Sequence, residues 1–283
     1  MSRPNHDTRN SERVRGFMSF LIFVFILLLG FSSCARSVFL NTQRIQNSFT
    51  DFNYVCSFEN DINDYANDLF VKNGLGTDSI DSVLDYDFCY RIIDEYTCAS
   101  LGIGSYSQST AQSTIEEKRD EIKALVKAEV KKSSQKYNDK AADSIADNIC
   151  TYIGNELNIK GMDKLKALLG AGKIASVAGV GVSALFVAAL SLITYFVGAK
   201  SYRSLRAISV SFLSAGFTNF VMSLMATIVF KLKSVDIYPV YLQNALMKHV
   251  NECINAVAFC GLCFIIVSLT ISSIVWKLKR KGK

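Results

Sequence analysis

Four long apolar segments without a charged residue or histidine constrain this chain more than any other feature of its sequence. They cover residues 16–35, 174–199, 207–230 and 253–276 and are 20 to 26 residues long. A helix of about 20 apolar residues crosses the hydrocarbon core of a bilayer, because each residue adds about 1.5 Å along the axis. Four fully buried helices of this length would be unusual in a soluble protein of 283 residues. The sequence therefore predicts an integral membrane protein with four transmembrane helices.

The first apolar segment also has features of a cleaved signal peptide. Arg13 and Arg15 form a basic region in front of it, as in secretory signals. Residues 32–34 end in Cys34 and have the form of a degraded lipoprotein cleavage site. We expect a retained transmembrane helix, with cleavage as the alternative. Both interpretations place residue 36 on the same side of the membrane.

The distribution of charge predicts the orientation of the spans. Basic residues close to short loops stay in the cytoplasm. Residues 1–15, 200–206 and 277–283 carry net charges of +2, +3 and +5, whereas residues 36–173 contain 16 basic and 21 acidic residues. The loop at 231–252 carries a net charge of +1. We therefore expect both termini in the cytoplasm and residues 36–173 outside it, in a protein of the cell (plasma) membrane.

The predicted fold is an all-α membrane protein with a mainly helical extracytoplasmic domain inserted between the first and second of four transmembrane helices. The expected order is a cytoplasmic N-terminus (1–15), transmembrane helix 1 (16–35), the extracytoplasmic domain (36–173), transmembrane helix 2 (174–199), a cytoplasmic loop (200–206), transmembrane helix 3 (207–230), an outer loop (231–252), transmembrane helix 4 (253–276) and a basic cytoplasmic tail (277–283).

The predicted outer domain has the periodicity of helices and almost none of the alternation of strands. Apolar residues recur every three or four positions through residues 45–69 and again through 145–157. Residues 100–112 are rich in serine and glycine and predict a loop. Ser113 or Thr114, followed by glutamates, predicts the N-terminal cap of a further helix. The pattern favours an antiparallel helical bundle.

Four of the eight cysteines lie in the predicted outer domain, where two disulfides have three possible pairings. Cys56 and Cys150 each lie on the apolar face of a predicted helix, and Cys89 and Cys98 are close in sequence. We therefore expect the pairs Cys56–Cys150 and Cys89–Cys98, with four reduced, buried thiols as the alternative. The domain has neither a CxxC pair nor a loop with EF-hand spacing, so we expect no metal site.

A stripe of small residues marks the second predicted span. Ala171, Ala175, Gly179 and Ser183 repeat every four residues. Small side chains at this spacing allow two helix backbones to approach closely. The stripe therefore predicts a close contact between helices, first within this chain and alternatively with another chain.

The third predicted span carries several polar side chains. Ser211, Ser214 and Thr218 share one helix face, and Asn219 lies beside them in the middle of the span. Among these residues, we most expect Asn219 to form a hydrogen bond between helices. Serine and threonine side chains also line the pores of some channels, so this face is a candidate pore lining.

The second predicted outer loop contains aromatic residues next to the fourth span. Tyr238 and Tyr241 suit the interface between lipid and water. Leu242, Leu246 and Val250 predict a short amphipathic helix that runs into the span.

The sequence excludes several classes of activity. Spans without ionisable residues argue against ion-coupled transport, voltage sensing and intramembrane proteolysis. The chain contains no nucleotide-binding, hydrolase or zinc-protease motif, so we expect neither an enzyme nor a bound cofactor. Its basic segments are short, so we expect no nucleic-acid binding.

These observations together predict a non-enzymatic multi-pass membrane protein whose outer helical domain binds a protein partner, as an accessory, adhesion or sensing component. The alternative is a subunit of a homo-oligomeric channel or pore. Self-association is expected in that second case.

Overall fold

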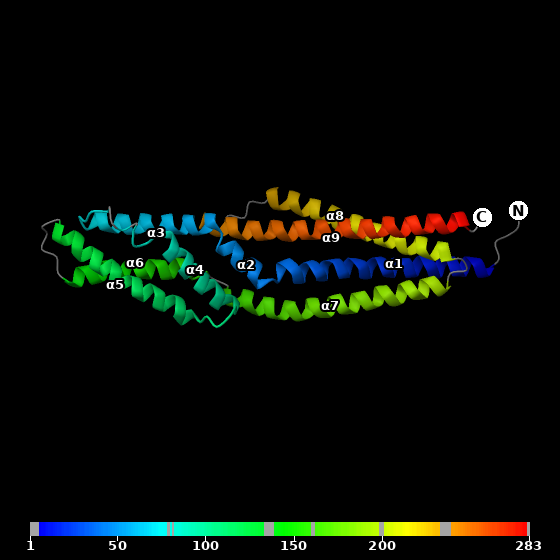
Figure 1. The fold of residues 1–283 in the computed structure, drawn as a ribbon, viewed down its shortest axis with the longest axis horizontal. Helices are drawn as coiled ribbons and strands as arrows, with labels where there is room; N and C mark the ends of the chain where they lie inside the picture. Colours follow the sequence, from blue (N-terminus) through cyan, green and yellow to red (C-terminus); the bar gives the residue numbers. More distant parts are fainter. Residues whose placement is uncertain are drawn as a thin grey trace. The chain divides into compact units, whose positions relative to one another are not determined.

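The computed structural model describes residues 6–77, 80, 82–132, 139–159, 162–197, 201–232 and 239–281 (Figure 1). Within these ranges all regular elements are helical, as predicted. The elements are α1 (His6–Cys34), a π-helical turn η1 (Ala35–Phe39), α2 (Thr42–Phe49), α3 (Phe52–Lys72), α4 (Tyr86–Leu101), α5 (Gln108–Lys132), α6 (Asp139–Leu157), α7 (Met162–Val197), α8 (Ser201–Leu232) and α9 (Val240–Lys281). Tyr238 and the outer ends of the predicted N-terminal segment and basic tail lie outside the described residues.

The chain forms two compact units. The span unit contains Met1–Asn41, Gly170–Ser234 and Val250–Lys283, and the helical unit contains Thr42–Leu169 and Val235–His249. The second predicted outer loop thus contributes to the helical unit. Its predicted amphipathic segment forms the beginning of α9.

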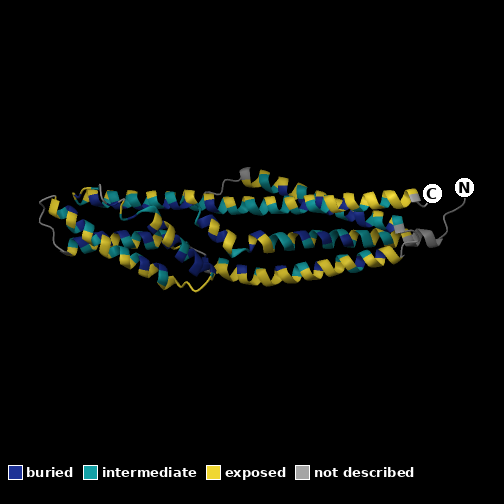
Figure 2. Ribbon diagram, viewed as in Figure 1, coloured by how far each residue is buried: buried dark blue, intermediate teal, exposed yellow. Residues whose placement is uncertain are grey.

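Four helices are long and apolar enough to cross a membrane, as the sequence predicts. They contain the stretches Glu12–Phe39, Lys164–Phe196, Tyr202–Phe230 and Val240–Arg280. Large apolar side chains are exposed along them, and Figure 2 shows exposed positions along much of α7. Phe196 and Phe259, for example, are 78% and 69% exposed. An apolar surface of this extent is expected against lipid and not against water, so the chain is an integral membrane protein.

Helix α1 contacts each of the other three long helices of the span unit. Ile26 is fully buried in a cluster with Leu190 of α7 and Ile208 of α8. The Cys34 thiol donates a hydrogen bond to the carbonyl oxygen of Ala256 on α9, with an Sγ–O distance of 3.4 Å. The first apolar segment is therefore a central element of this unit.

Helices α8 and α9 meet at a crossing that only glycine permits. A Cβ atom on Gly216 would lie 2.6 Å from the carbonyl oxygen of Gly261, and a Cβ on Gly261 would lie 2.7 Å from that of Gly216. Two serines also join these helices. Ser209 Oγ donates to the Ser268 carbonyl oxygen at 2.9 Å, and Ser268 Oγ donates to the Ser209 carbonyl oxygen at 2.7 Å. Small residues and short hydrogen bonds thus hold the pair together.

The helical unit has an apolar core built from regularly spaced positions. In α3 the fully buried residues Val55, Phe58, Ile62, Ala66 and Phe70 recur every three or four positions. Further fully buried side chains come from α4, α5 and α6, namely Ile92, Ile122, Ile149 and Ile153. Helices thus form where the sequence shows this periodicity, in 45–69 and 145–157.

The predicted loop before α5 is present but shorter than expected, and the predicted cap is wrong. Residues 102–107 form the connection, whereas α5 begins at Gln108, so Ser113 and Thr114 lie inside the helix. Ser113 Oγ donates to the Thr110 carbonyl oxygen at 2.8 Å. Thr114 Oγ1 donates to Glu95 Oε2 of α4 at 2.7 Å, in a buried position. This contact with α4 gives the hydroxyl a partner that local sequence does not reveal.

Tyr241 belongs to the core of the helical unit, so its predicted place at the membrane interface is wrong. The residue is 7% exposed, and its hydroxyl donates to Glu156 Oε2 of α6 at 3.1 Å. Its ring packs edge-on against Tyr54, with 5.1 Å between the centroids. Lys248 lies on α9, as does Tyr241, and its Nζ lies 2.5 Å from Asp51 Oδ1. The first turns of α9 are therefore anchored to α3 and α6.

Candidate binding groove

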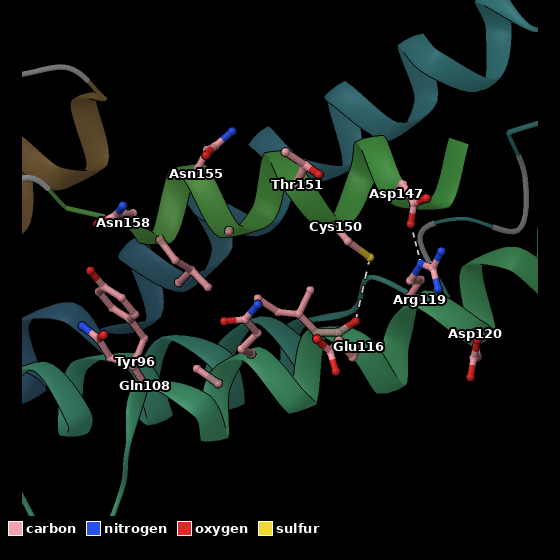
Figure 3. Close-up of a pocket in the computed structure, with 15 residues that line it drawn as sticks. Tyr96, Gln108, Glu116, Arg119, Asp120, Asp147, Cys150, Thr151, Asn155 and Asn158 are labelled. Atoms are coloured by element: carbon pink, nitrogen blue, oxygen red, sulfur yellow. Dashed lines mark hydrogen bonds and ion pairs between the residues drawn. The ribbon is translucent and has the colours of Figure 1, made fainter. Parts of the chain in front are cut away.

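A groove with a volume of about 830 Å³ lies between α5 and α6 in the helical unit (Figure 3). This volume falls within the usual range for ligand sites of about 300–1,000 Å³. The lining is mainly polar. It consists of Tyr96, Gln108, Ala111, Gln112, Ile115, Glu116, Arg119, Asp120, Asp147, Cys150, Thr151, Gly154, Asn155, Leu157 and Asn158.

Two ion pairs join the helices that form the walls. Arg119 of α5 pairs with Asp147 of α6, and Lys123 pairs with Asp143. The residue numbers of the two pairs increase along α5, from 119 to 123, and decrease along α6, from 147 to 143. The two helices are therefore antiparallel. Ile149 is fully buried behind the groove. Apolar packing and ion pairs thus set the spacing of the walls.

The walls are also fixed from behind by α3 and α4. Glu95 of α4 is 7% exposed and accepts the hydrogen bond of Thr114 from α5. On α6, Tyr152 donates to Asp61 Oδ2 of α3 at 3.1 Å and stacks on Tyr65 with 3.9 Å between the ring centroids. A groove with walls held in this way does not need to be ordered by its ligand, which lowers the entropic cost of binding.

One end of the groove is rich in primary amides. Gln108 and Gln112 are four residues apart on α5, and Asn155 and Asn158 are three residues apart on α6. Figure 3 shows Gln108 close to Tyr96, near this end. Each primary amide offers both a donor and an acceptor, which matches the alternating N–H and C=O groups of a polypeptide.

The other end is acidic. Glu116, Asp120 and Asp147 contribute three carboxylates, against the single cation Arg119. The hydrogen bond to Asp147 raises the pKa of Arg119, so the guanidinium stays charged. The net charge of this end is therefore negative, and it favours a basic side chain of a ligand.

The single thiol of the groove is unsuited to covalent chemistry. Cys150 Sγ donates to the Ile115 carbonyl oxygen, with a distance of 3.8 Å. Burial raises the pKa of this thiol to about 11, so it is protonated at neutral pH. Only the thiolate is a good nucleophile. Cys150 therefore lacks the thiolate form that a nucleophile requires at neutral pH.

Local sequence does not reveal this groove. Residues 100–112 are predicted to form a loop, whereas Gln108 and Gln112 line the groove from the first turns of α5. The signal that points to them is the helical spacing of the amides, four residues on α5 and three on α6. Only the pairing of the two helices shows that these amides belong to one site.

The structure contains all eight cysteines as free thiols. Cys89 and Cys98 lie on the continuous helix α4, nine residues and therefore about 13 Å apart along its axis. A disulfide requires Cα atoms within about 7 Å, so this predicted pair is wrong. Cys98 Sγ instead accepts a hydrogen bond from Gln46 Nε2 at 3.0 Å. The pairing of Cys56 with Cys150 stays a prediction.

The small residues of the second span contact α1 along a face that is shifted from the predicted stripe. A Cβ atom on Gly179 would lie 2.5 Å from Ser32 Oγ of α1, and Ser183 is 3% exposed. Ala171 and Ala175 are exposed. The neighbouring Gly172 lies close to Leu40, the residue after η1, because a Cβ there would lie 2.7 Å from Leu40 Cδ2.

The predicted polar face of the third span divides between the inside and the outside of the span unit. Ser211 is buried, and its Oγ donates to the Ser19 carbonyl oxygen at 2.8 Å. Ser214 is exposed, and Thr218 donates to the Ser214 carbonyl oxygen of its own helix at 2.8 Å.

Asn219 is buried but does not form the interhelical hydrogen bond expected of it. The residue is 1% exposed, and its amide makes no hydrogen bond within the described part of the chain. A Cβ atom on Gly30 would lie 2.8 Å from Asn219 Nδ2. The amide is thus enclosed by a close approach of α1.

No protein-family model, curated protein or solved structure matches this chain.

Proposed function

We propose that this chain is a non-enzymatic membrane protein whose helical unit lies outside the cytoplasm and binds a protein partner in the α5–α6 groove. The observation that supports this proposal is the groove itself, a hollow of about 830 Å³ with a polar lining on a well-packed scaffold. The partner contributes a polar segment to the amide end and a lysine or arginine side chain to the acidic end.

The proposed orientation rests on the positive-inside rule. Residues 1–15, 200–206 and 277–283 are all net positive, whereas residues 36–173 carry five more acidic than basic residues. Positive segments next to spans stay in the cytoplasm. In this arrangement the helical unit and its groove face away from the cytoplasm and meet partners there.

In this proposal α1 is retained in the mature protein. Ile22 and Ile26 are fully buried, and α1 also contacts α7 and α9. Removing the helix would expose the buried surfaces of three neighbours. A signal peptide that is cleaved has no reason to supply the central packing surface of the remaining spans.

Site-specific photocrosslinking tests the proposed groove. A photoreactive phenylalanine analogue replaces Gln112, which is exposed and lines the groove, in cells that make the protein naturally. The control places the same analogue at Asn60, which is exposed on α3 and does not line the groove. We expect one defined protein adduct from position 112 and none from position 60.

A second arm shows whether the adduct depends on the chemistry of the groove. Combining the analogue at 112 with Glu116→Gln and Asp120→Asn removes two of the three carboxylates at the acidic end. We expect the adduct to disappear. An adduct that survives this change, or equal adducts at positions 112 and 60, would contradict the proposed groove.

The orientation has its own test. A cysteine introduced at Gln108 should react with a membrane-impermeant thiol reagent applied to intact cells, whereas a cysteine introduced at Arg203 should not. Mass spectrometry of the labelled peptides separates these sites from the eight native cysteines. Labelling at position 203 without permeabilisation would reverse the proposed orientation.

A homo-oligomeric pore is the competing function. Ser211 and Asn219 are buried within the helices of one chain, so a pore between chains would have Ser214 and Thr218 as its only polar lining from the predicted face. The mass of the particle in nanodiscs decides between the two functions. A closed ring of several copies would favour the pore, and a single copy would exclude a pore between chains.

A further inference from the structure

A second hollow lies in the span unit and is lined by the N-terminal parts of α1 and α8. Its volume is about 320 Å³. The two walls follow the same helical spacing, because each helix contributes residues at positions i, i+3, i+4 and i+7. These residues are Glu12, Arg15, Gly16 and Ser19 of α1 and Arg203, Arg206, Ala207 and Val210 of α8.

Serine hydrogen bonds join the two helices that form the walls of this hollow. Ser19 Oγ and Ser211 Oγ are 2.7 Å apart, and Ser211 Oγ also lies 2.8 Å from the Ser19 carbonyl oxygen. Ser19 Oγ further donates to the Ala207 carbonyl oxygen at 3.2 Å. The two walls are therefore held at a fixed spacing, and the small residues Gly16 and Ala207 leave the space between them open.

The hollow is strongly basic. Arg15, Arg203 and Arg206 line it together with one carboxylate, that of Glu12, which gives a net charge of +2. Arginine is always charged in proteins, and its planar guanidinium forms paired hydrogen bonds with two oxygens of a phosphate. Three guanidinium groups on two fixed helices can contact several oxygens of one ligand. They therefore suit a ligand with a tetrahedral phosphate better than a ligand with one planar carboxylate.

The hollow lies where two apolar spans begin. The apolar stretches start at Glu12 and at Tyr202, so the arginines occupy the level of the lipid head groups. Exposed apolar side chains continue from the same helix ends into the spans. Phe17 is 61% exposed, Val210 is 50% exposed and Leu213 is 44% exposed. A ligand here meets cationic groups at one end and an apolar surface along its length.

We propose that this hollow, the arginine pocket, binds the phosphate of an anionic phospholipid through Arg15, Arg203 and Arg206. The acyl chains lie along the exposed apolar surfaces of α1 and α8. Basic pockets between transmembrane helices are a recurrent way of holding such head groups. This proposal is independent of the partner groove, because it concerns the other unit and a different ligand.

Native mass spectrometry of the full chain tests the arginine pocket. The delipidated protein is titrated with phosphatidylglycerol and, in parallel, with phosphatidylcholine, and retained lipid adducts are counted at increasing collision energy. We expect one phosphatidylglycerol molecule to be retained with at least tenfold preference over phosphatidylcholine. Equal retention of the two lipids would overturn the proposal.

Matched variants separate the pocket from general charge. Arg206→Gln should reduce phosphatidylglycerol retention at least tenfold. Arg13→Gln, an exposed arginine of α1 that does not line the pocket, should leave it unchanged. Equal losses in the two variants would show that only the overall positive charge attracts the lipid, and would overturn the proposal.

A steric variant keeps the test valid if the arginine variants fold poorly. A Cβ atom on Gly16 meets no atom within 4 Å, so Gly16→Leu fits the fold but fills the pocket while its charges remain. We expect this variant to elute as a single species and to lose retained phosphatidylglycerol. A Gly16→Leu protein that retains the lipid as well as the unmodified chain would overturn the proposal.

Soluble phosphates distinguish a lipid from a free anion. Thermal unfolding is followed with phosphatidylglycerol, with glycerol 3-phosphate and with inorganic phosphate. We expect an upward shift of the melting temperature by the lipid and none by the two soluble anions at millimolar concentration. An equal shift by inorganic phosphate would assign the pocket to a soluble ligand and refute the lipid assignment.

Discussion

The helical unit and the span unit differ in where they place serine and large aromatic side chains. In the helical unit the largest fully buried side chains are Phe58 and Phe70. In the span unit Ser209 and Ser211 are 3% and 2% exposed, whereas Phe196 is 78% exposed. Both units bury aliphatic side chains, such as Ile62 in the helical unit and Ile26 in the span unit, so the contrast concerns serine and phenylalanine.

The difference shows that the solvent decides which interactions hold helices together. Water drives apolar side chains into the core of the helical unit, at about 25 cal/mol per Å² of apolar surface. Lipid gives no such drive, because it is as apolar as a protein core. The helices of the span unit therefore associate through glycine contacts, as at Gly216 and Gly261, and through serine hydrogen bonds.

The largest expected effect contrasts one phenylalanine from each unit. Phe58→Ala should destabilise the helical unit by about 3–5 kcal/mol, because it removes a fully buried ring and leaves a cavity. Phe196→Ala should change the stability of the span unit by far less, because its ring faces lipid in the folded and unfolded spans. Hydrogen exchange of α3 and α7 amides in nanodiscs measures both. Similar losses in the two variants would break the comparison.

The next effect concerns the glycine crossing of the span unit. Gly216→Ala should destabilise the bundle by about 1–3 kcal/mol, because its Cβ would meet the backbone of α9, which cannot move aside cheaply. The control is Gly181→Ala, since a Cβ there meets no atom within 4 Å. Thermal unfolding in nanodiscs compares them. A crossing that tolerates alanine would mean that α8 and α9 approach less closely than described.

A smaller effect concerns the anchoring of α9 in the helical unit. Tyr241→Phe should cost about 1 kcal/mol, because the ring stays packed but Glu156 loses its hydrogen-bond donor. Tyr106→Phe is the control, since this ring is 45% exposed. Hydrogen exchange of the first α9 amides reports the change. If both variants behave alike, the buried hydroxyl contributes nothing measurable.

The smallest expected effect is the pH dependence of one surface ion pair. A hydrogen bond from Lys123 lowers the pKa of Asp143 from its usual value of 3.8. An ion pair that lowers the pKa of a carboxyl in the folded chain stabilises the fold at pH values above the pKa of that carboxyl in the unfolded chain. This stabilisation is lost as the pH falls below about 4. Asp143→Asn should therefore destabilise the protein slightly at pH 7, with the difference shrinking toward pH 3.

Glu117→Gln serves as its control, because it removes an exposed carboxylate outside this ion pair. Denaturation curves at several pH values measure both variants. A penalty for Asp143→Asn that grows on acidification would have the wrong sign for this ion pair. Added salt should reduce the penalty at pH 7, since the pair is partly exposed.

The sequence predicts those features that depend on local pattern. Four apolar segments are enough to locate α1, α7, α8 and α9, because the thickness of a bilayer sets the length of a span. Apolar residues at helical spacing likewise predict α3 and α6. The all-helical fold follows from these signals without knowledge of any contact.

Features that depend on contacts between distant residues were missed. Residues 108–114 contain little apolar periodicity, and Thr114 is stabilised in α5 by Glu95 from another helix. The aromatic residues around Tyr241 suggest an interface between lipid and water. In the structure, contacts with Glu156 and Tyr54 place Tyr241 in the helical unit instead. The groove and the arginine pocket are each lined by two helices that lie side by side. The sequence of one helix does not show which other helix packs beside it.

The position of Tyr241 also dictates when the helical unit is completed during synthesis. Most of this unit ends at Leu169, but its last segment, Val235–His249, follows only after most of α7 and all of α8. At about 5–20 residues per second, the ribosome needs several seconds to make the intervening chain. During that interval Tyr54 and Phe58 lack the ring of Tyr241 that packs against them in the complete chain. The nascent chain thus carries an unfinished apolar surface until its third span has been made, and truncation before residue 241 should leave a species that chaperones and proteases recognise.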